Sequence, residues 1–248
     1  MKRKTTYFYG PYIKQSLAPV PRARDGPEIR KRKAQATGAA MLFMNQKNSW
    51  QRLKMLLAEN FPTPGSALVL VLTFDDAHLP GSRKKVLDRH EYFRAKLRED
   101  RRKAGLPDPR IFWVPEVLTS AAGRWHVHTV IDSTGRDLPM IRKRWIYGAV
   151  LSEPLRVDKK KNHESLARYL SKELREAQEY TSRPGLHGWS HTRNIRKPEI
   201  SVETVPDYYE LRPPEGYAVL YDELRQTEFT GYHVQECVRR SDEASAFL

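Results

Sequence analysis

Residues 67–73 form an unbroken apolar run, Ala-Leu-Val-Leu-Val-Leu, that closes on Thr and is followed by Phe74-Asp75-Asp76. A short apolar run that ends in polar residues is typical of a strand buried on both faces of a sheet. We therefore expect a central strand over about 67–76. The rest of the fold has to supply partners for both of its edges and cover for both of its faces.

The downstream pattern alternates between helical and extended segments. Pro80-Gly81-Ser82 interrupts the chain before a helical pattern, and Pro107 and Pro109 end that pattern. The predicted elements that follow residue 76 are a helix at 82–104, a strand at 110–117, a strand at 124–131, a helix at 137–147, a strand at 149–157 and a helix at 162–180. This order predicts an α+β fold with a central antiparallel sheet of about five strands and helices on one face. Pro115 indicates an edge position or a bulge in its strand.

The two ends of the chain differ from the middle. Residues 1–40 contain four prolines and the run Arg30-Lys31-Arg32-Lys33 without apolar periodicity, and we expect a flexible, disordered basic arm. A short amphipathic helix is predicted at 48–60. Strand-like segments at 199–205, 217–221 and 230–236 predict a β-rich C-terminal extension, which either stands apart or pairs with the main sheet. The predicted domains are 1–40, 41–198 and 199–248.

Charge is distributed unevenly over these three sections. The chain has a formal net charge of +14, with +8 in residues 1–40, +13 in residues 41–198 and −7 in residues 199–248. A basic central domain with a basic arm is typical of a polyanion binder, nucleic acid first, although a solvated surface is the simpler alternative.

Other features of the composition narrow the class of protein. The single Cys237 excludes a disulfide framework and a cysteine-based zinc cluster, and it fits a reducing cytosol. No apolar run reaches the roughly 18 residues of a membrane span, and the basic N-terminus lacks the apolar segment of a signal peptide. We expect a cytoplasmic protein with no membrane partner.

The segment Arg124-Trp125-His126-Val127-His128-Thr129 carries the first chemical signal. In a strand, residues two apart point to the same face, so His126 and His128 lie side by side. Paired imidazoles can bind one divalent metal ion. The alternative is a polar sheet face that happens to carry two histidines.

Glu116 lies ten residues before His126, across a predicted turn at 119–123. In an antiparallel hairpin, its carboxylate can stand beside the imidazoles and complete a metal site with open positions. The alternative for Glu116 is a cross-strand salt bridge, for example with Arg124. Asp75 and Asp76 are possible additional ligands, but a turn or helix-cap role suits them better.

The predicted helix at 162–180 contains Tyr169 and Lys172, three residues apart on one face. Leu166, Leu170 and Leu174 form its apolar stripe. A tyrosine beside such a stripe is usually a packing residue. A phenol can instead attack phosphorus when a neighbouring ammonium and a polarised phosphate assist it.

Four features of the chain together resemble the HUH endonucleases. They are the strand that ends in Thr73-Phe74, the residue Glu116, the segment His126-Val127-His128 and the segment Tyr169-Leu170-Ser171-Lys172. More narrowly, the chain resembles single-tyrosine rolling-circle replication initiators of phages, plasmids and integrated mobile elements. The resemblance covers about residues 66–200 and implies a ferredoxin- or RRM-like core. The segment 189–198 is similar to the basic segment that follows the tyrosine helix in such initiators.

The resemblance implies a reaction and a set of partners. Glu116, His126 and His128 would bind Mg²⁺ or Mn²⁺, Tyr169 would form a 5′-phosphotyrosine link and release a 3′-OH, and Lys172 would orient the tyrosine–phosphate pair. The same site could later rejoin the strand. The implied partners are single-stranded or cruciform origin DNA and the helicase and polymerase of a bacterial host. Two-tyrosine initiators carry a second nucleophile where this chain has Ser165, and Tyr180 is poorly placed to replace it.

Further basic residues could hold the phosphates of the DNA, with a solvated loop as the alternative for each. The candidates are Lys159, Lys160, Lys161, Arg168, Arg193, Arg196 and Lys197.

Four other functions are alternatives for these residues. A non-catalytic binder of single-stranded nucleic acid would explain the charge but neither the histidines nor the Tyr–Lys pair. A two-His–carboxylate iron oxygenase has a similar ligand set but gains nothing from the basic charge. A His-triad hydrolase would need a further histidine where the chain has Val130. Related single-tyrosine transposases and relaxases are the hardest to separate, although relaxases usually place the tyrosine near the N-terminus.

Overall fold

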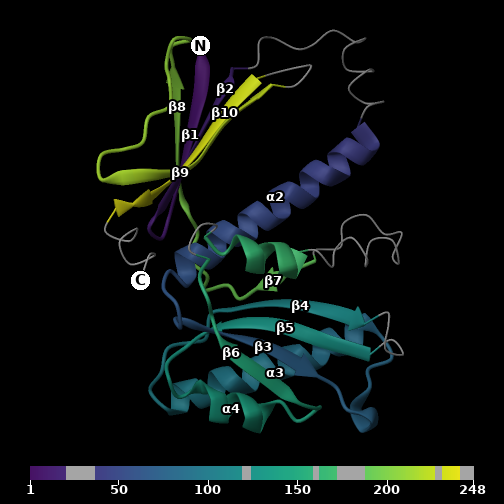
Figure 1. Cartoon of the computed structure of the whole chain (residues 1–248). Helices are drawn as coiled ribbons and strands as arrows, with labels where there is room; N and C mark the ends of the chain where they lie inside the picture. Colours follow the sequence, from purple (N-terminus) through teal and green to yellow (C-terminus); the bar gives the residue numbers. More distant parts are fainter. Residues whose placement is uncertain (21–36, 119–123, 159–161, 172–187, 227–230, 241–248) are drawn as a thin grey trace. The chain divides into compact units, whose positions relative to one another are not determined.

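The computed structural model of the chain describes residues 1–20, 37–118, 124–158, 162–171, 188–226 and 231–240. These residues belong to two compact units. The first comprises Met1–Glu59, Asp158–Asn162 and Lys197–Leu248, and the second comprises Asn60–Val157 and His163–Arg196. Each unit contains a five-stranded antiparallel sheet (Figure 1). The predicted α+β class is confirmed, with two sheets where the sequence indicated one.

The sheet of the first unit has the strand order β8-β1-β2-β10-β9. Its strands are β1 (Lys2–Tyr9), β2 (Tyr12–Pro19), β8 (Glu199–Val205), β9 (Tyr217–Gln226) and β10 (Gly231–Arg239). The bounds predicted for β8 agree with the structure, whereas β9 and β10 are longer than the predicted segments. No helix among the described residues combines the length and apolar character needed to cross a membrane.

The prediction of a disordered arm over residues 1–40 is wrong for residues 2–19, which form the hairpin β1–β2. Tyr9 pairs with Tyr12 across the two-residue turn Gly10-Pro11, and Gly10 takes the positive φ of 54° that such turns require. Charged side chains among the apolar ones concealed the strand pattern. The hairpin also obtains its neighbouring strands from the far end of the chain, which no local pattern can reveal.

The acidic C-terminal segment pairs with this basic hairpin and not with the second sheet. β8 is antiparallel to β1, and β10 is antiparallel to β2. Opposite charges meet as a result, because Lys4 Nζ lies 3.7 Å from Glu203 and the N-terminal ammonium lies 2.6 Å from Asp207. The two chain ends that the sequence divides into separate domains therefore form one sheet.

The helix predicted at 48–60 is longer than expected. It is α2, which spans Thr37–Asn60, and Leu53 and Leu57 are fully buried in it. Lys54 on this helix donates to both carboxylate oxygens of Glu236 on β10 at 2.7 Å. The first unit extends to Glu59, so the boundary predicted at residue 41 falls inside α2 and not between units.

The sheet of the second unit has the order β6-β3-β5-β4-β7. Its elements are β3 (Ala67–Thr73), the 3-10 turn η1 (Asp76–His78), α3 (Arg83–Lys103), β4 (Ile111–Leu118), β5 (Arg124–Asp132), α4 (Asp137–Arg144), β6 (Val150–Pro154) and β7 (Ser190–His191). The predicted order of strand, helix, two strands, helix and strand is confirmed over β3 to β6. The Ser82 side chain caps α3 by accepting from the Lys85 amide.

Pro115 lies where its missing N–H costs least. β4 pairs with β5 along its whole length but with β7 only at Phe112 and Trp113. The strand is therefore an edge strand at Pro115, as predicted.

Successive side chains of β5 point alternately to the two faces of this sheet. Val127 and Ile131 pack with Phe93 and Leu97 of α3 and with Ile141 of α4 in one buried core. Figure 1 shows α3 and α4 on this face of the sheet. His126 and His128 point to the opposite face, which we call the histidine face.

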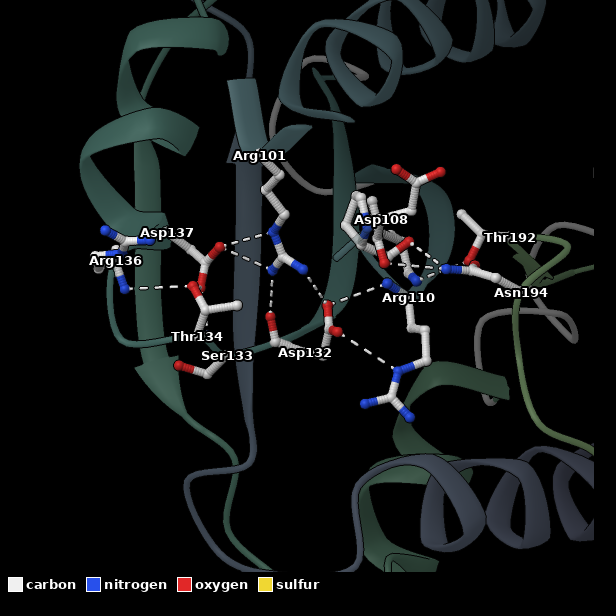
Figure 2. Close-up of polar contacts among 12 residues, drawn as sticks. Arg101, Asp108, Arg110, Asp132, Ser133, Thr134, Arg136, Asp137, Thr192 and Asn194 are labelled. Atoms are coloured by element: carbon white, nitrogen blue, oxygen red, sulfur yellow. Dashed lines mark hydrogen bonds and ion pairs between the residues drawn. The ribbon is translucent and has the colours of Figure 1, made fainter. Parts of the chain in front are cut away.

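A buried ion cluster joins the end of α3 to the sheet. Arg101 is fully buried and donates to Asp137 at 2.8 Å, to the Asp132 carboxylate at 2.8 Å and to the Asp132 carbonyl at 2.6 Å. Figure 2 shows its guanidinium between the two aspartates. Asp137 also accepts from the amide and hydroxyl of Thr134. The cluster holds α3, the end of β5 and the start of α4 together at the end of the strand away from His126.

Candidate metal and tyrosine site

The hairpin β4–β5 brings the three predicted metal ligands together. The antiparallel register pairs Glu116 with His126 and Val114 with His128. Glu116 therefore lies on the histidine face, since residues directly opposite each other in an antiparallel pair share a face. Local strand alternation and hairpin register are enough to build this arrangement.

The ligand atoms of these residues converge closely. Glu116 Oε2 lies 2.8 Å from His128 Nε2 and also contacts His126 Nε2, and the two imidazole Nε2 atoms are 3.0 Å apart. Both histidines are buried, and the Glu116 side chain is 16% exposed. This cluster is the one group of three His, Cys, Asp or Glu side chains found in the described part of the chain that could hold a metal ion.

The residues fit a divalent cation. Two ligand atoms on neighbouring corners of an octahedron, about 2.1 Å from a cation, are about 3.0 Å apart, and the two Nε2 atoms have this separation. Two imidazoles and one carboxylate on one side of a cation leave its other positions open.

The structure shows which contacts Glu116, Arg124 and Asp75 make. Arg124 pairs with Asp76, whereas Glu116 contacts the histidines. Asp75 caps η1 by accepting from the His78 amide at 3.0 Å, so the expected cap role is confirmed. Glu116 therefore belongs to the histidine cluster and not to a salt bridge with Arg124.

Tyr169 reaches the same cluster from a helical segment at 164–171. Its hydroxyl is 3.4 Å from His128 Nε2, and the two rings meet edge to face with centroids 5.1 Å apart. Ala167 and Leu170 are buried and anchor the segment, while Tyr169 remains 50% exposed. The tyrosine thus lies on the histidine face and is open to a substrate.

The segment that carries Tyr169 begins at an unusual backbone turn that the sequence analysis missed. Asn162 and His163 both have positive φ, 46° and 59°, and both are buried. Asn162 Nδ2 lies 3.4 Å from Glu236 within the first unit, and His163 Nε2 donates to the Phe61 carbonyl at 2.8 Å within the second. Left-handed non-glycine residues cost about 1–3 kcal/mol each. The one local signal was Asn162, because Asn tolerates this conformation better than most residues.

The predicted DNA-binding residues fall into two groups. Arg168 is exposed and pairs with Glu164 one helical turn earlier, and Arg193, Arg196 and Lys197 are exposed. Four predicted site residues lie outside the described residues, namely Lys159, Lys160, Lys161 and Lys172. Tyr180 and Leu174 lie outside them as well.

Comparisons of the chain with protein-family models, with curated proteins and with solved structures found no match. The functional interpretation therefore depends on the geometry of the site and on the charge of the chain.

Proposed function

We propose that the chain is a metal-dependent single-strand DNA endonuclease and strand transferase of the HUH type that initiates rolling-circle replication. The observation that carries the proposal is the position of the Tyr169 hydroxyl, 3.4 Å from a nitrogen of the His–His–Glu cluster. A phenol half exposed to solvent and directed at three convergent ligand atoms suits covalent catalysis better than packing.

His126, His128 and Glu116 are the residues that would hold the cation. A bound divalent cation would draw charge from a phosphate oxygen and make the phosphorus a better electrophile. Burial of both imidazoles keeps water away from their ring edges and limits their rotation. Glu116, bound to both rings, holds them in this orientation.

The chemical step is a transesterification. The Tyr169 oxygen attacks the phosphorus of the scissile phosphodiester, and the bond from phosphorus to the 3′ oxygen breaks. The phenolic proton is lost to solvent and the leaving 3′ oxygen takes up a proton, so the products are a 5′-phosphotyrosine and a free 3′-OH. No water is consumed, and attack by the 3′-OH on the phosphotyrosine reverses the step and rejoins the strand.

The charge of the chain supports DNA as the substrate. Residues 41–198 have a net charge of +13, and a basic surface attracts the phosphates of a single-stranded or cruciform origin. A 3′-OH left at the nick is a primer, which implies a replication helicase and polymerase of a bacterial host as functional partners. A cytoplasmic location follows from the same proposal.

The proposal is tested by incubating the full chain with Mn²⁺ and supercoiled plasmids that carry candidate origins, including the DNA that flanks its own gene. We expect nicked circles that carry the protein at a 5′ end. Tyr169→Phe should abolish the covalent adduct and leave DNA binding within about twofold, because only the nucleophilic oxygen is removed. His128→Ala should reduce nicking by about 100-fold or more and raise the Mn²⁺ concentration required.

The controls separate this proposal from its rivals. Arg142→Ala, an exposed change on α4 at the opposite face of the sheet, should nick like the wild type. An adduct that persists in Tyr169→Phe would show that the nucleophile is another residue. DNA binding without nicking on every origin would favour a non-catalytic binder of single-stranded nucleic acid.

A further inference from the structure

A row of aromatic rings lies on the histidine face at the outer edge of the second sheet. His191 on β7 pairs with Phe112 on β4, and their ring centroids are 5.8 Å apart. Trp189, two residues before His191, lies at 6.0 Å from its ring with the planes inclined by only 31°. Phe112 shares a face with Glu116, because the two are four residues apart on one strand. The three rings therefore continue the histidine face outward.

The exposure of these rings changes along the row. Phe112 is 1% exposed and packs edge to face against Phe61, so it is part of the core. His191 and Trp189 are partly exposed. Because solvent reaches the outer two rings but not the inner one, the row presents an aromatic edge supported from below by buried rings.

The segment that carries this edge is firmly attached to β4. The Thr192 amide donates to the Ile111 carbonyl at 2.9 Å, and the Ile111 amide donates to the Thr192 hydroxyl at 3.0 Å. Asn194 Nδ2 donates to the carbonyls of Asp108 and Pro109 at 3.1 and 3.3 Å. Figure 2 shows Thr192 and Asn194 beside Asp108 and Arg110. A side chain on such a fixed segment needs little ordering when a ligand binds.

The row is close to the cluster of Glu116, His126 and His128. β7 is separated from β5 by β4 alone, so His191 lies about 10 Å from β5 across the sheet and about 7 Å along it from the pair Val114–His128. A strand whose phosphate reaches Tyr169 therefore spans the distance to Trp189 with a few nucleotides. Arg193, exposed at the turn that follows, is available to a phosphate of the same strand.

We propose that Trp189, supported by His191, is a stacking site for a nucleobase of single-stranded DNA adjacent to the scissile phosphate. This proposal rests on the proposed function, because it treats Tyr169 and the histidine cluster as the reacting centre. Stacking on an aromatic ring accepts every base and requires the strand to be unpaired at that position. The site would thus favour single-stranded or extruded DNA over duplex, whatever the origin sequence.

The test compares two probes of equal charge in the presence of EDTA, where binding is measured without cleavage. One is a fluorescein-labelled 12-nucleotide thymidine oligomer, and the other is a 12-nucleotide abasic oligomer. In fluorescence anisotropy, Trp189→Ala should weaken binding of the thymidine oligomer about tenfold, in the range typical of a lost base stack, and that of the abasic oligomer less than twofold. Trp189→Phe should stay within about threefold of the wild type on both.

Tyr92→Ala is the matched control, since it removes a ring that is 51% exposed on α3 and leaves the histidine face intact. It should change neither affinity. If Trp189→Ala weakens both probes equally, or leaves the thymidine oligomer unaffected, the stacking site is wrong.

A measurement on the wild type keeps the proposal testable if Trp189→Ala unfolds. Ultraviolet crosslinking to a thymidine oligomer that contains 5-iodouracil should attach the base at Trp189, within the tryptic peptide 176–193, and attachment only elsewhere would overturn the proposal. The two proposals fail separately. If the protein nicks DNA but binds both probes equally well, only the stacking proposal is contradicted. If binding depends on the bases and on Trp189 but no origin is nicked, only the endonuclease proposal is contradicted.

Discussion

The two sheets of this protein have the same number of strands and the same antiparallel pairing, but they use charge in opposite ways. The first sheet joins a basic hairpin to acidic strands from the other end of the chain, so that Lys4 meets Glu203 and the N-terminus meets Asp207. The second sheet belongs to the section that keeps a net charge of +13. The net charge of a sequence segment therefore indicates a binding partner only when the charges of the neighbouring strands are also known.

This comparison changes the interpretation of the N-terminus. Residues 1–20 have a net charge of +4, and the described residues 199–226 and 231–240 have a net charge of −4. These segments form one sheet, so their charges balance. The proposed attraction for DNA therefore does not come from the strands of this sheet, whereas residues 41–198, with a net charge of +13, also contain the cluster of Glu116, His126 and His128.

Each unit also buries a cation, and the largest stability effect is expected for the one in the second unit. Arg101→Met leaves Asp137 buried without its cation and leaves Asp132 with Arg110, whose Nε is 3.5 Å away. The loss should cost about 3–5 kcal/mol of the free energy of unfolding. Urea unfolding measures this cost. Hydrogen exchange should locate it in peptides from α3, β5 and α4, with peptides of β1 and β2 unchanged.

The neighbouring arginine provides the control. Arg102 is an exposed side chain that pairs with Asp108, and Arg102→Ala should leave the urea midpoint within experimental error. Equal losses from Arg101→Met and Arg102→Ala would contradict the assigned role of the buried cluster.

A smaller effect is expected for the buried pair of the first unit. Glu236→Gln leaves the ammonium of Lys54, which is 5% exposed, with neutral partners. The substitution should cost about 2–3 kcal/mol, since the amide oxygen retains one hydrogen bond and only one charge is left unpaired. In hydrogen exchange, α2 and β10 should lose protection while β3 and β5 keep theirs. Loss of protection in both sheets would show that the units do not unfold separately.

The smallest effect concerns pH. Burial, together with the nearby Arg94, holds the pKa of His90 well below its usual value of 6.5. His90 therefore stabilises the fold fully above about pH 6.5, and this contribution decreases as the pH falls, because the unfolded chain then binds a proton that the folded one resists. His90→Gln, which can still bond to the Thr129 hydroxyl, should flatten the dependence of unfolding free energy on pH between 7 and 5. An unchanged slope would mean that other groups control the acid sensitivity.

The cluster of Glu116, His126 and His128 was the most predictable part of the site. Strand alternation places His126 beside His128, and the short hairpin brings Glu116 opposite them, so both relations span no more than twelve residues. Tyr169 was predicted as a residue type on a helix, but its contact with His128 depends on how that helix meets the sheet. Asn162 and His163 were missed because the conformation that begins this helix is held by Glu236 and Phe61, which are far away in sequence.

By itself, the sequence determined the elements of the second unit, their order and the face on which the histidines lie, because periodicity and hairpin register act between near neighbours. Only the tertiary structure decided that residues 2–19 are strands, that β8 and β10 pair with them, that Tyr169 contacts His128 and that Trp189 extends the histidine face. Each of these depends on pairing or packing between segments separated by about 40 to 200 residues. Such contacts depend on the burial and hydrogen bonding of the whole chain. A local sequence pattern determines only part of that balance.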